Sequence, residues 1–227
     1  MISMRKRIHK GVILDVSHGR FDNGAATFAT VFVDKEDPSI TYLFYTGAED
    51  TRLSHASIGL ATSRDGMNFR KADELNPIIE SQRTSFCSEE DLTPAVTRVG
   101  SHFYMILAGK PSIRKGRRLG IAYADDLRGP WRVIGELIRP KEYWEGKDID
   151  LGPCITKINE SELIVYYSNV SNKWPLNIMF GSRFLRRRIG ILKLKITSPS
   201  SIKAYRYKGN PLKHLNGPKG SWNEWLF

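Results

Sequence analysis

Cysteine is scarce in this sequence, since the 227 residues include only Cys87 and Cys154. Two cysteines are too few for a disulfide framework, and without histidines at metal-ligand spacing they do not indicate a zinc site. No apolar run approaches the ~18 residues of a transmembrane helix, and no apolar segment of a secretory signal follows the basic start. We therefore expect reduced thiols in a cytoplasmic protein with no membrane partner.

Helical periodicity is absent along the whole chain, and two common enzyme motifs are absent as well. No glycine cluster follows a strand and opens a helix, so no phosphate-binding loop is predicted. No Gly-x-Ser-x-Gly elbow of a serine hydrolase is present. The apolar share of 41% and the charged share of 26% are those of a globular protein, which excludes disorder and coiled coil.

Positive charge is concentrated in the last quarter of the chain. The formal net charge is +11, and residues 173–227 hold twelve Lys+Arg against one acid, whereas residues 21–172 hold 18 basic and 22 acidic residues. The basic residues lie at alternate positions of a strand-like stretch, as Lys193 and Lys195 do, or in the run Arg186–Arg188. Solvated strand faces and a loop account for this pattern, so nucleic acid is not an expected partner. Another polyanion is the alternative.

A repeat of about sixty residues runs along the chain and determines the predicted fold. Each unit contains two strand-like runs rich in β-branched and aromatic residues, then a third run around an anchor glycine: Gly59, Gly120 or Gly190. An aromatic residue after the next turn, Phe69 or Trp131, begins a fourth strand. Four antiparallel strands repeated every ~60 residues predict an all-β fold, a β-propeller, whereas β-sandwiches show no such repeat.

The phrases Ile58-Gly-Leu-Ala-Thr-Ser-Arg-Asp-Gly-Met-Asn-Phe69 and Leu119-Gly-Ile-Ala-Tyr-Ala-Asp-Asp-Leu-Arg-Gly-Pro-Trp131 resemble blade signatures of the five-bladed β-propeller glycosidases. These include the arabinanase/xylosidase, invertase/levansucrase and mannoside phosphorylase groups. Phe21-Asp-Asn-Gly-Ala25 resembles the opening of a first blade. The resemblance covers roughly residues 20–194. It implies that the innermost strand of each blade lines a channel, with acidic residues near one mouth.

Hydrolysis of a glycosidic bond needs one protonated and one ionised carboxyl group on either side of the bond. Acidic residues precede the first strand of each unit at Asp22, in the Glu89–Asp91 cluster and at Asp148 and Asp150. If they converge on a channel, repulsion between like charges raises one pKa and creates the acid.

The resemblance implies roles for three of these residues. Asp22 is the base from the first blade, Asp150 orients the substrate, with Asp91 nearly as suitable, and Glu90 is the acid. The order departs from the family, whose acid follows its middle Asp. The alternative is that Asp91 and Asp150 cap the blade entries through side-chain hydrogen bonds.

Four residues are expected to bind substrate: Asp91, Asp148, Trp144 and Arg20. Trp144 could stack on a sugar ring or pack between blades, and Arg20 could bind the glycan or lie in a surface loop. No cofactor is expected, although a structural cation on the propeller axis would leave no trace in the sequence.

The chain is short for a five-bladed propeller, which at ~60 residues per blade needs about 300 residues. We place units over residues 21–80, 81–140 and 141–197. A linker, Ser198–Ser201, and a strand over Tyr205–Asn210 then make residues 198–227 the start of a further blade, so that the single domain is incomplete. Open blade edges favour self-association.

Three functions are open at this point. The first is a glycoside hydrolase acting on a carbohydrate. The second is a non-catalytic carbohydrate-binding or assembly propeller. The third is a module that binds a polyanion through its basic C-terminal third.

Overall fold

The computed structural model describes residues 11–81, 86–112, 114–170 and 188–212. These residues form three four-stranded antiparallel sheets, in each of which the strands follow chain order. The strands are β1 (Ala25–Val33), β2 (Thr41–Ala48), β3 (Ser57–Ser63), β4 (Arg70–Lys71), β5 (Glu90–Val99), β6 (His102–Lys110), β7 (Arg118–Ala124), β8 (Arg132–Ile138), β9 (Asp148–Asn159), β10 (Glu162–Val170), β11 (Ile189–Ser198) and β12 (Ser201–Arg206).

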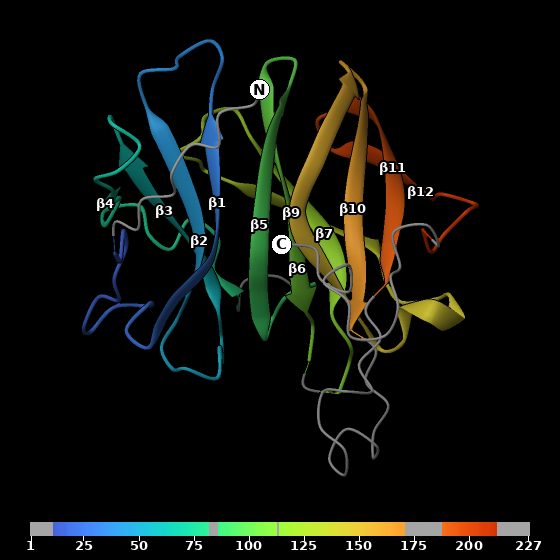
Figure 1. Cartoon of the computed structure of the whole chain (residues 1–227), viewed down its shortest axis with the longest axis horizontal. Helices are drawn as coiled ribbons and strands as arrows, with labels where there is room; N and C mark the ends of the chain where they lie inside the picture. Colours follow the sequence, from blue (N-terminus) through green and yellow to red (C-terminus); the bar gives the residue numbers. More distant parts are fainter. Residues whose placement is uncertain (1–10, 82–85, 113, 171–187, 213–227) are drawn as a thin grey trace, which may run out of the picture.

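The three sheets stand side by side as blades around an arc (Figure 1). The first strand of each sheet is innermost, and β5 packs between β1 and β9. The only other regular element in the described residues is a short 3-10 turn, η2 (Tyr143–Glu145). None of the described residues forms a helix with the length and apolar character that a bilayer crossing requires. The predicted all-β propeller architecture is confirmed.

Apolar side chains fill the space between neighbouring sheets because strand residues alternate between the two faces. One cluster joins the first and second sheets and includes Tyr42, Phe44, Ile58, Leu60, Phe103, Met105 and Leu107. A second cluster joins the second and third sheets and includes Tyr104, Ile106, Leu119, Ile121, Leu163, Val165 and Leu192. Both faces of the second sheet are therefore buried, which explains its nearly continuous apolar strands.

The anchor glycines make room for an aromatic ring within their own blade. A Cβ added to Gly59 would lie 2.7 Å from the ring of Phe21, and one added to Gly120 would lie 2.3 Å from the ring of Phe86. At Gly190 the ring belongs to Trp144, at 2.5 Å. In each blade the segment before the inner strand thus folds over the third strand, so the repeat seen in the sequence is a packing repeat.

The structure corrects the prediction for residues 198–212. Ser198 and Ser201 pair across a tight hairpin, and Ser201–Arg206 is β12, the outer strand of the third sheet. The predicted linker is therefore a turn, and the predicted strand over Tyr205–Asn210 does not begin a further blade. In the first two units an aromatic residue, Phe69 or Trp131, directly precedes the fourth strand, and the third unit has no aromatic residue in that place. Residues 213–227 lie outside the described part of the chain.

Candidate functional site

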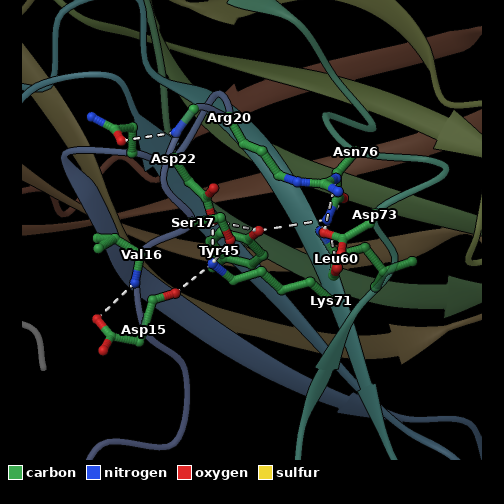
Figure 2. Close-up of polar contacts among 12 residues, drawn as sticks. Asp15, Val16, Ser17, Arg20, Asp22, Tyr45, Leu60, Lys71, Asp73 and Asn76 are labelled. Carbon is green, nitrogen blue, oxygen red and sulfur yellow. Dashed lines mark hydrogen bonds and ion pairs between the residues drawn. The ribbon is translucent and has the colours of Figure 1, made fainter.

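Asp22 lies inside the first blade. Its side chain is 1% exposed, and Oδ2 accepts hydrogen bonds from the Tyr45 hydroxyl at 3.0 Å and from Lys71 Nζ at 2.5 Å. Figure 2 shows that Lys71 also donates to the Asp15 carbonyl and, at 2.8 Å, to the Ser17 hydroxyl. Lys71 comes from the outermost strand, β4, so these bonds tie the segment before β1 to the far edge of the same sheet.

The third blade repeats this arrangement with different residues. The carboxylate of Glu145 is fully buried and accepts hydrogen bonds from the Tyr167 hydroxyl at 2.7 Å and from Arg206 Nε at 2.8 Å. Arg206 lies on the outermost strand, β12, as Lys71 does on β4. Tyr167 pairs with its anchor glycine across the sheet, as Tyr45 does in the first blade. We call each such set a carboxylate–tyrosine–cation trio.

Among the described residues of the second blade there is no such trio. Cys87 follows Phe86 as Asp22 follows Phe21, and Leu107 takes the place of the tyrosine opposite the anchor glycine. Cys87 is fully buried. A blade with an apolar residue at the tyrosine position needs no carboxylate there, so the trio belongs to blade construction in the first and third blades.

Burial and charge shift the pKa of both tyrosines and of Glu145. Burial is the main reason that the pKa of each tyrosine, Tyr45 and Tyr167, lies far above its ordinary value, and the adjacent carboxylate adds to the effect. Burial alone would raise the pKa of Glu145. The bonds that it accepts from Arg206, from Tyr167 and from two backbone N–H groups outweigh burial and lower that pKa. In the third blade the proton therefore stays on Tyr167 and the charge on Glu145.

Asp150 lies where the second and third blades meet. The Thr93 hydroxyl donates to Asp150 Oδ1 at 3.1 Å, and the Thr93 N–H donates to Thr46 Oγ1 of the first blade at 3.2 Å. Arg117 lies 3.5 Å from Asp150 Oδ2, and the Asp150 side chain is 17% exposed. A line of polar contacts thus connects all three blades near the beginning of their inner strands. We call this end of the sheets the mouth.

A β-bulge explains how Thr93 reaches both neighbours. The pairing of β5 with β6 shifts between Leu92 and Ala95, and Thr93 takes a positive φ of 50°. A bulge leaves a backbone N–H outside the ladder and redirects a side chain. β1 has a matching shift with Phe28 at a φ of 47°. β1 and β5 are therefore built alike, although of these two only β5 presents a hydroxyl at this point.

Asp148 also lies at the mouth, where its Oδ1 accepts a hydrogen bond from the Arg117 N–H at 2.8 Å. Glu90 and Asp91 begin β5, opposite Lys110 and Gly109 in the pairing with β6. The side chains of Glu90 and Asp91 lie outside the described features.

Asp91 and Asp150 do not hold equivalent places in their sheets. Asp91 pairs with Gly109 of β6. Gly109 in turn pairs with Arg118 of β7, two residues before the anchor glycine of this blade. Asp150 pairs with Ser168 of β10. Ser168 in turn pairs with Ile189 of β11, one residue before the anchor glycine of that blade. The two residues therefore differ by one position in register relative to the anchor glycine of their blade.

Two predicted substrate-binding residues lie away from the mouth contacts. The ring of Trp144 packs against Tyr167 at a centroid distance of 5.5 Å and covers Gly190, inside the third blade. Arg20 is half-exposed and pairs with Asp73 at 3.3 Å, near the outer edge of the first blade (Figure 2).

The sequence interpretation missed the partners of these carboxylates. Tyr45 and Tyr167 both follow an aromatic or aliphatic run in the second strand, and Lys71 and Arg206 both lie in the fourth. That shared placement in two units was a usable signal. The role of Thr93 carries no such signal, because a bulge is not visible in the sequence.

Two grooves among the described residues lie away from the inner strands. One of about 850 Å³ lies between Glu74–Glu80 and Arg128–Val133, and one of about 510 Å³ is lined by Ile40, Thr62 and Arg70 among others. Neither is lined by an inner-strand residue. The candidate site at the mouth therefore rests on its polar contacts.

No protein-family model and no curated protein matches the sequence. Solved structures do match. Zg3597, a family 117 glycoside hydrolase of the marine bacterium Zobellia galactanivorans, aligns with a TM-score of 0.61 at 15% identity, over 86% of this chain and 59% of that one. The GH32 beta-fructofuranosidase BmSUC1 of Bombyx mori aligns with a TM-score of 0.57 at 18% identity, over 80% and 36%.

The beta-1,2-mannobiose phosphorylase of Listeria innocua aligns with a TM-score of 0.55 at 16% identity, over 81% of this chain and 44% of that one. These neighbours have the fold of the five-bladed β-propeller glycosidases, so the resemblance in fold is confirmed. The chain spans between about a third and three fifths of the length of these structures.

Proposed function

We propose that the protein binds a glycan at the mouth and hydrolyses a glycosidic bond there. Asp150 carries this proposal, because its carboxylate is partly exposed at the point where polar contacts join all three blades. The similar structures that are named as glycoside hydrolases support the reaction class. The proposed substrate is a carbohydrate.

The proposed reacting pair is Asp150 and Glu90. Glycoside hydrolysis needs one carboxyl group that donates a proton to the leaving oxygen and one that acts in its ionised form. The ion pair with Arg117 suits Asp150 to the ionised role. Glu90 begins the neighbouring inner strand and is the proposed acid. The bound sugar would lie between the two strand entries.

We leave Asp22 out of the reacting pair, although the sequence favoured it as the base. Its carboxylate is 1% exposed and is paired with Lys71, and Glu145 repeats its contacts in the third blade. A general base must reach a water molecule or substrate hydroxyl within hydrogen-bond distance. The proposed role of Asp22 is to hold the first blade together.

The second candidate is a carbohydrate-binding propeller without catalysis. The enclosure of Asp22 favours it, because the carboxylate that the sequence favoured as the base is buried and paired with Lys71. The two candidates share the binding site and differ in turnover.

The test is hydrolysis of a panel of aryl-glycosides and oligosaccharides by the full chain. Asp150→Asn and Glu90→Gln are each expected to reduce turnover by about 100-fold or more, the scale of loss of one acid–base group. The matched control is Asp125→Asn, an exposed aspartate that follows β7 at the end of the sheet opposite the mouth. It should retain the wild-type rate.

The outcomes separate the candidates. Oligosaccharide binding without turnover supports the non-catalytic function. Turnover that survives both Asp150→Asn and Glu90→Gln removes the proposed pair. A chain that neither binds nor cleaves any glycan of the panel contradicts the proposed function.

A further inference from the structure

The loop between β6 and β7, together with the strand residue on either side of it, is strongly basic. Residues 110–118 contain five basic side chains and no acidic one: Lys110, Arg114, Lys115, Arg117 and Arg118. The corresponding β2–β3 loop of the first blade, residues 49–56, contains Glu49, Asp50 and a single Arg52. In the sequence, the segment between β10 and β11 of the third blade, residues 171–188, also holds five basic residues and no acidic one, so the positive charge distinguishes the second blade from the first and not from the third.

Contacts with the start of β9 hold this loop at the mouth. The Arg117 N–H donates to Asp148 Oδ1 at 2.8 Å, and the Arg117 carbonyl accepts from the Ile149 N–H at 3.3 Å. At Gly116 the backbones approach so closely that a Cβ would lie 1.8 Å from the Lys147 carbonyl oxygen. The loop is thus fixed beside Asp150 before any ligand arrives.

Four of these basic side chains divide into two groups. Arg118 is paired with Glu136 at 2.5 Å, and Arg117 lies 3.5 Å from Asp150, so both have acidic partners. Arg114 and Lys115 are exposed, and no ion pair involves them within the described part of the chain. These two cations are available to a ligand at the mouth.

We propose that the glycan is anionic, and that Arg114 and Lys115 recognise a carboxylate or sulfate group on one of its rings. This inference rests on the proposed function and names its substrate class. Arginine and lysine bind such groups by charge-assisted hydrogen bonds. Because the loop is already held in place, little ordering cost opposes the contact. The attraction between exposed charges weakens as salt rises.

The experiment measures binding of a matched pair of probes to the full chain by calorimetry. Oligogalacturonate supplies one carboxylate per ring, and its methyl ester has the same rings and linkages without the charge. A sulfated galactan oligosaccharide is the third probe, which separates sulfate from carboxylate recognition. Binding of at least one anionic probe is expected to exceed that of the neutral ester by about tenfold or more and to fall with salt.

The variants are Arg114→Gln with Lys115→Gln, and a control with the same charge change. The control, Lys195→Gln with Lys203→Gln, removes two exposed lysines that face each other on β11 and β12, near the hairpin away from the mouth. The loop variant should lose about tenfold or more in affinity for the anionic probe, and the control should match wild type.

The results also separate this inference from the proposed function. Anionic probes that bind through Arg114 and Lys115 without being cleaved support the inference and contradict the hydrolase. Neutral glycans cleaved equally well by wild type and the loop variant support the hydrolase and overturn the inference. Equal losses in both double variants show general attraction of a polyanion to basic surface, which also overturns it.

Discussion

The carboxylates of this propeller belong to two different environments, the blade interior and the mouth. Asp22 and Glu145 are enclosed, and each binds a tyrosine hydroxyl and a cation of the outermost strand. Asp150 lies between blades, is partly exposed and bonds to a threonine of the neighbouring inner strand. An acidic residue before an inner strand can therefore serve the fold or face a ligand, and its partners decide which.

We call the enclosed carboxylates, Asp22 and Glu145, the interior set. The largest expected loss of stability is in this set. Asp22→Asn leaves the Lys71 ammonium buried without a countercharge, and breaking a buried pair in this way costs about 3–5 kcal/mol. Urea denaturation should show that loss in the free energy of unfolding. The double variant Asp22→Asn with Lys71→Met should recover most of it. A cost of less than about 1 kcal/mol for the single change would mean that Asp22 does not hold the blade together.

Acid should weaken the third blade through Glu145. The folded pKa of Glu145 is lowered, so its contribution to stability is present above the unfolded value of 4.5 and is lost as pH falls through the folded pKa. Each unit of that difference is worth about 1.4 kcal/mol. Unfolding free energies from about pH 5 to about pH 3 should fall less steeply in Glu145→Gln than in wild type. Identical slopes would show that other carboxylates dominate acid unfolding.

A smaller effect is expected where the blades meet. Thr93→Val removes the hydroxyl that donates to Asp150 but keeps the β-branched shape, so it should cost about 1 kcal/mol. The Thr93 N–H bond to Thr46 persists in this variant. Thermal unfolding measures the change, with Thr93→Ser as the matched variant that keeps the hydroxyl. Equal losses in both would point to packing of the methyl group instead of the hydrogen bond.

The smallest change in stability is expected at the mouth itself. Asp150→Asn keeps an oxygen that accepts from Thr93, and the pair with Arg117 is partly exposed, so the loss should be about 0.5 kcal/mol. This variant is also the one expected to lose activity. A large loss of stability in Asp150→Asn would place Asp150 with the interior set and would remove the contrast between the two environments.

The repeat in the sequence predicted the fold because its spacing follows from packing. Gly59, Gly120 and Gly190 each sit under an aromatic ring, so glycine and aromatic residues recur at fixed places in every blade. The outer strand of the third blade was misplaced because Ser201–Arg206 follows the Ser198–Ser201 hairpin directly, without the aromatic start seen at Phe69 and Trp131.

The candidate site could be predicted only in part. Asp22 and Asp150 both precede or begin an inner strand, and in the sequence they look alike. They differ in contacts made across the sheet, to Lys71 in one case, and between blades, to Thr93 in the other. Such contacts depend on strand register and on a bulge, which local composition does not determine.

The ring that covers each anchor glycine has a consequence for the order in which the chain folds. Phe21 and Gly59 are 38 residues apart, Phe86 and Gly120 are 34 apart, and Trp144 and Gly190 are 46 apart. Each blade can therefore close on itself as soon as its own residues leave the ribosome, because short contact separations favour fast folding. The first blade then serves as a finished surface for the second, and synthesis and assembly proceed in the same direction.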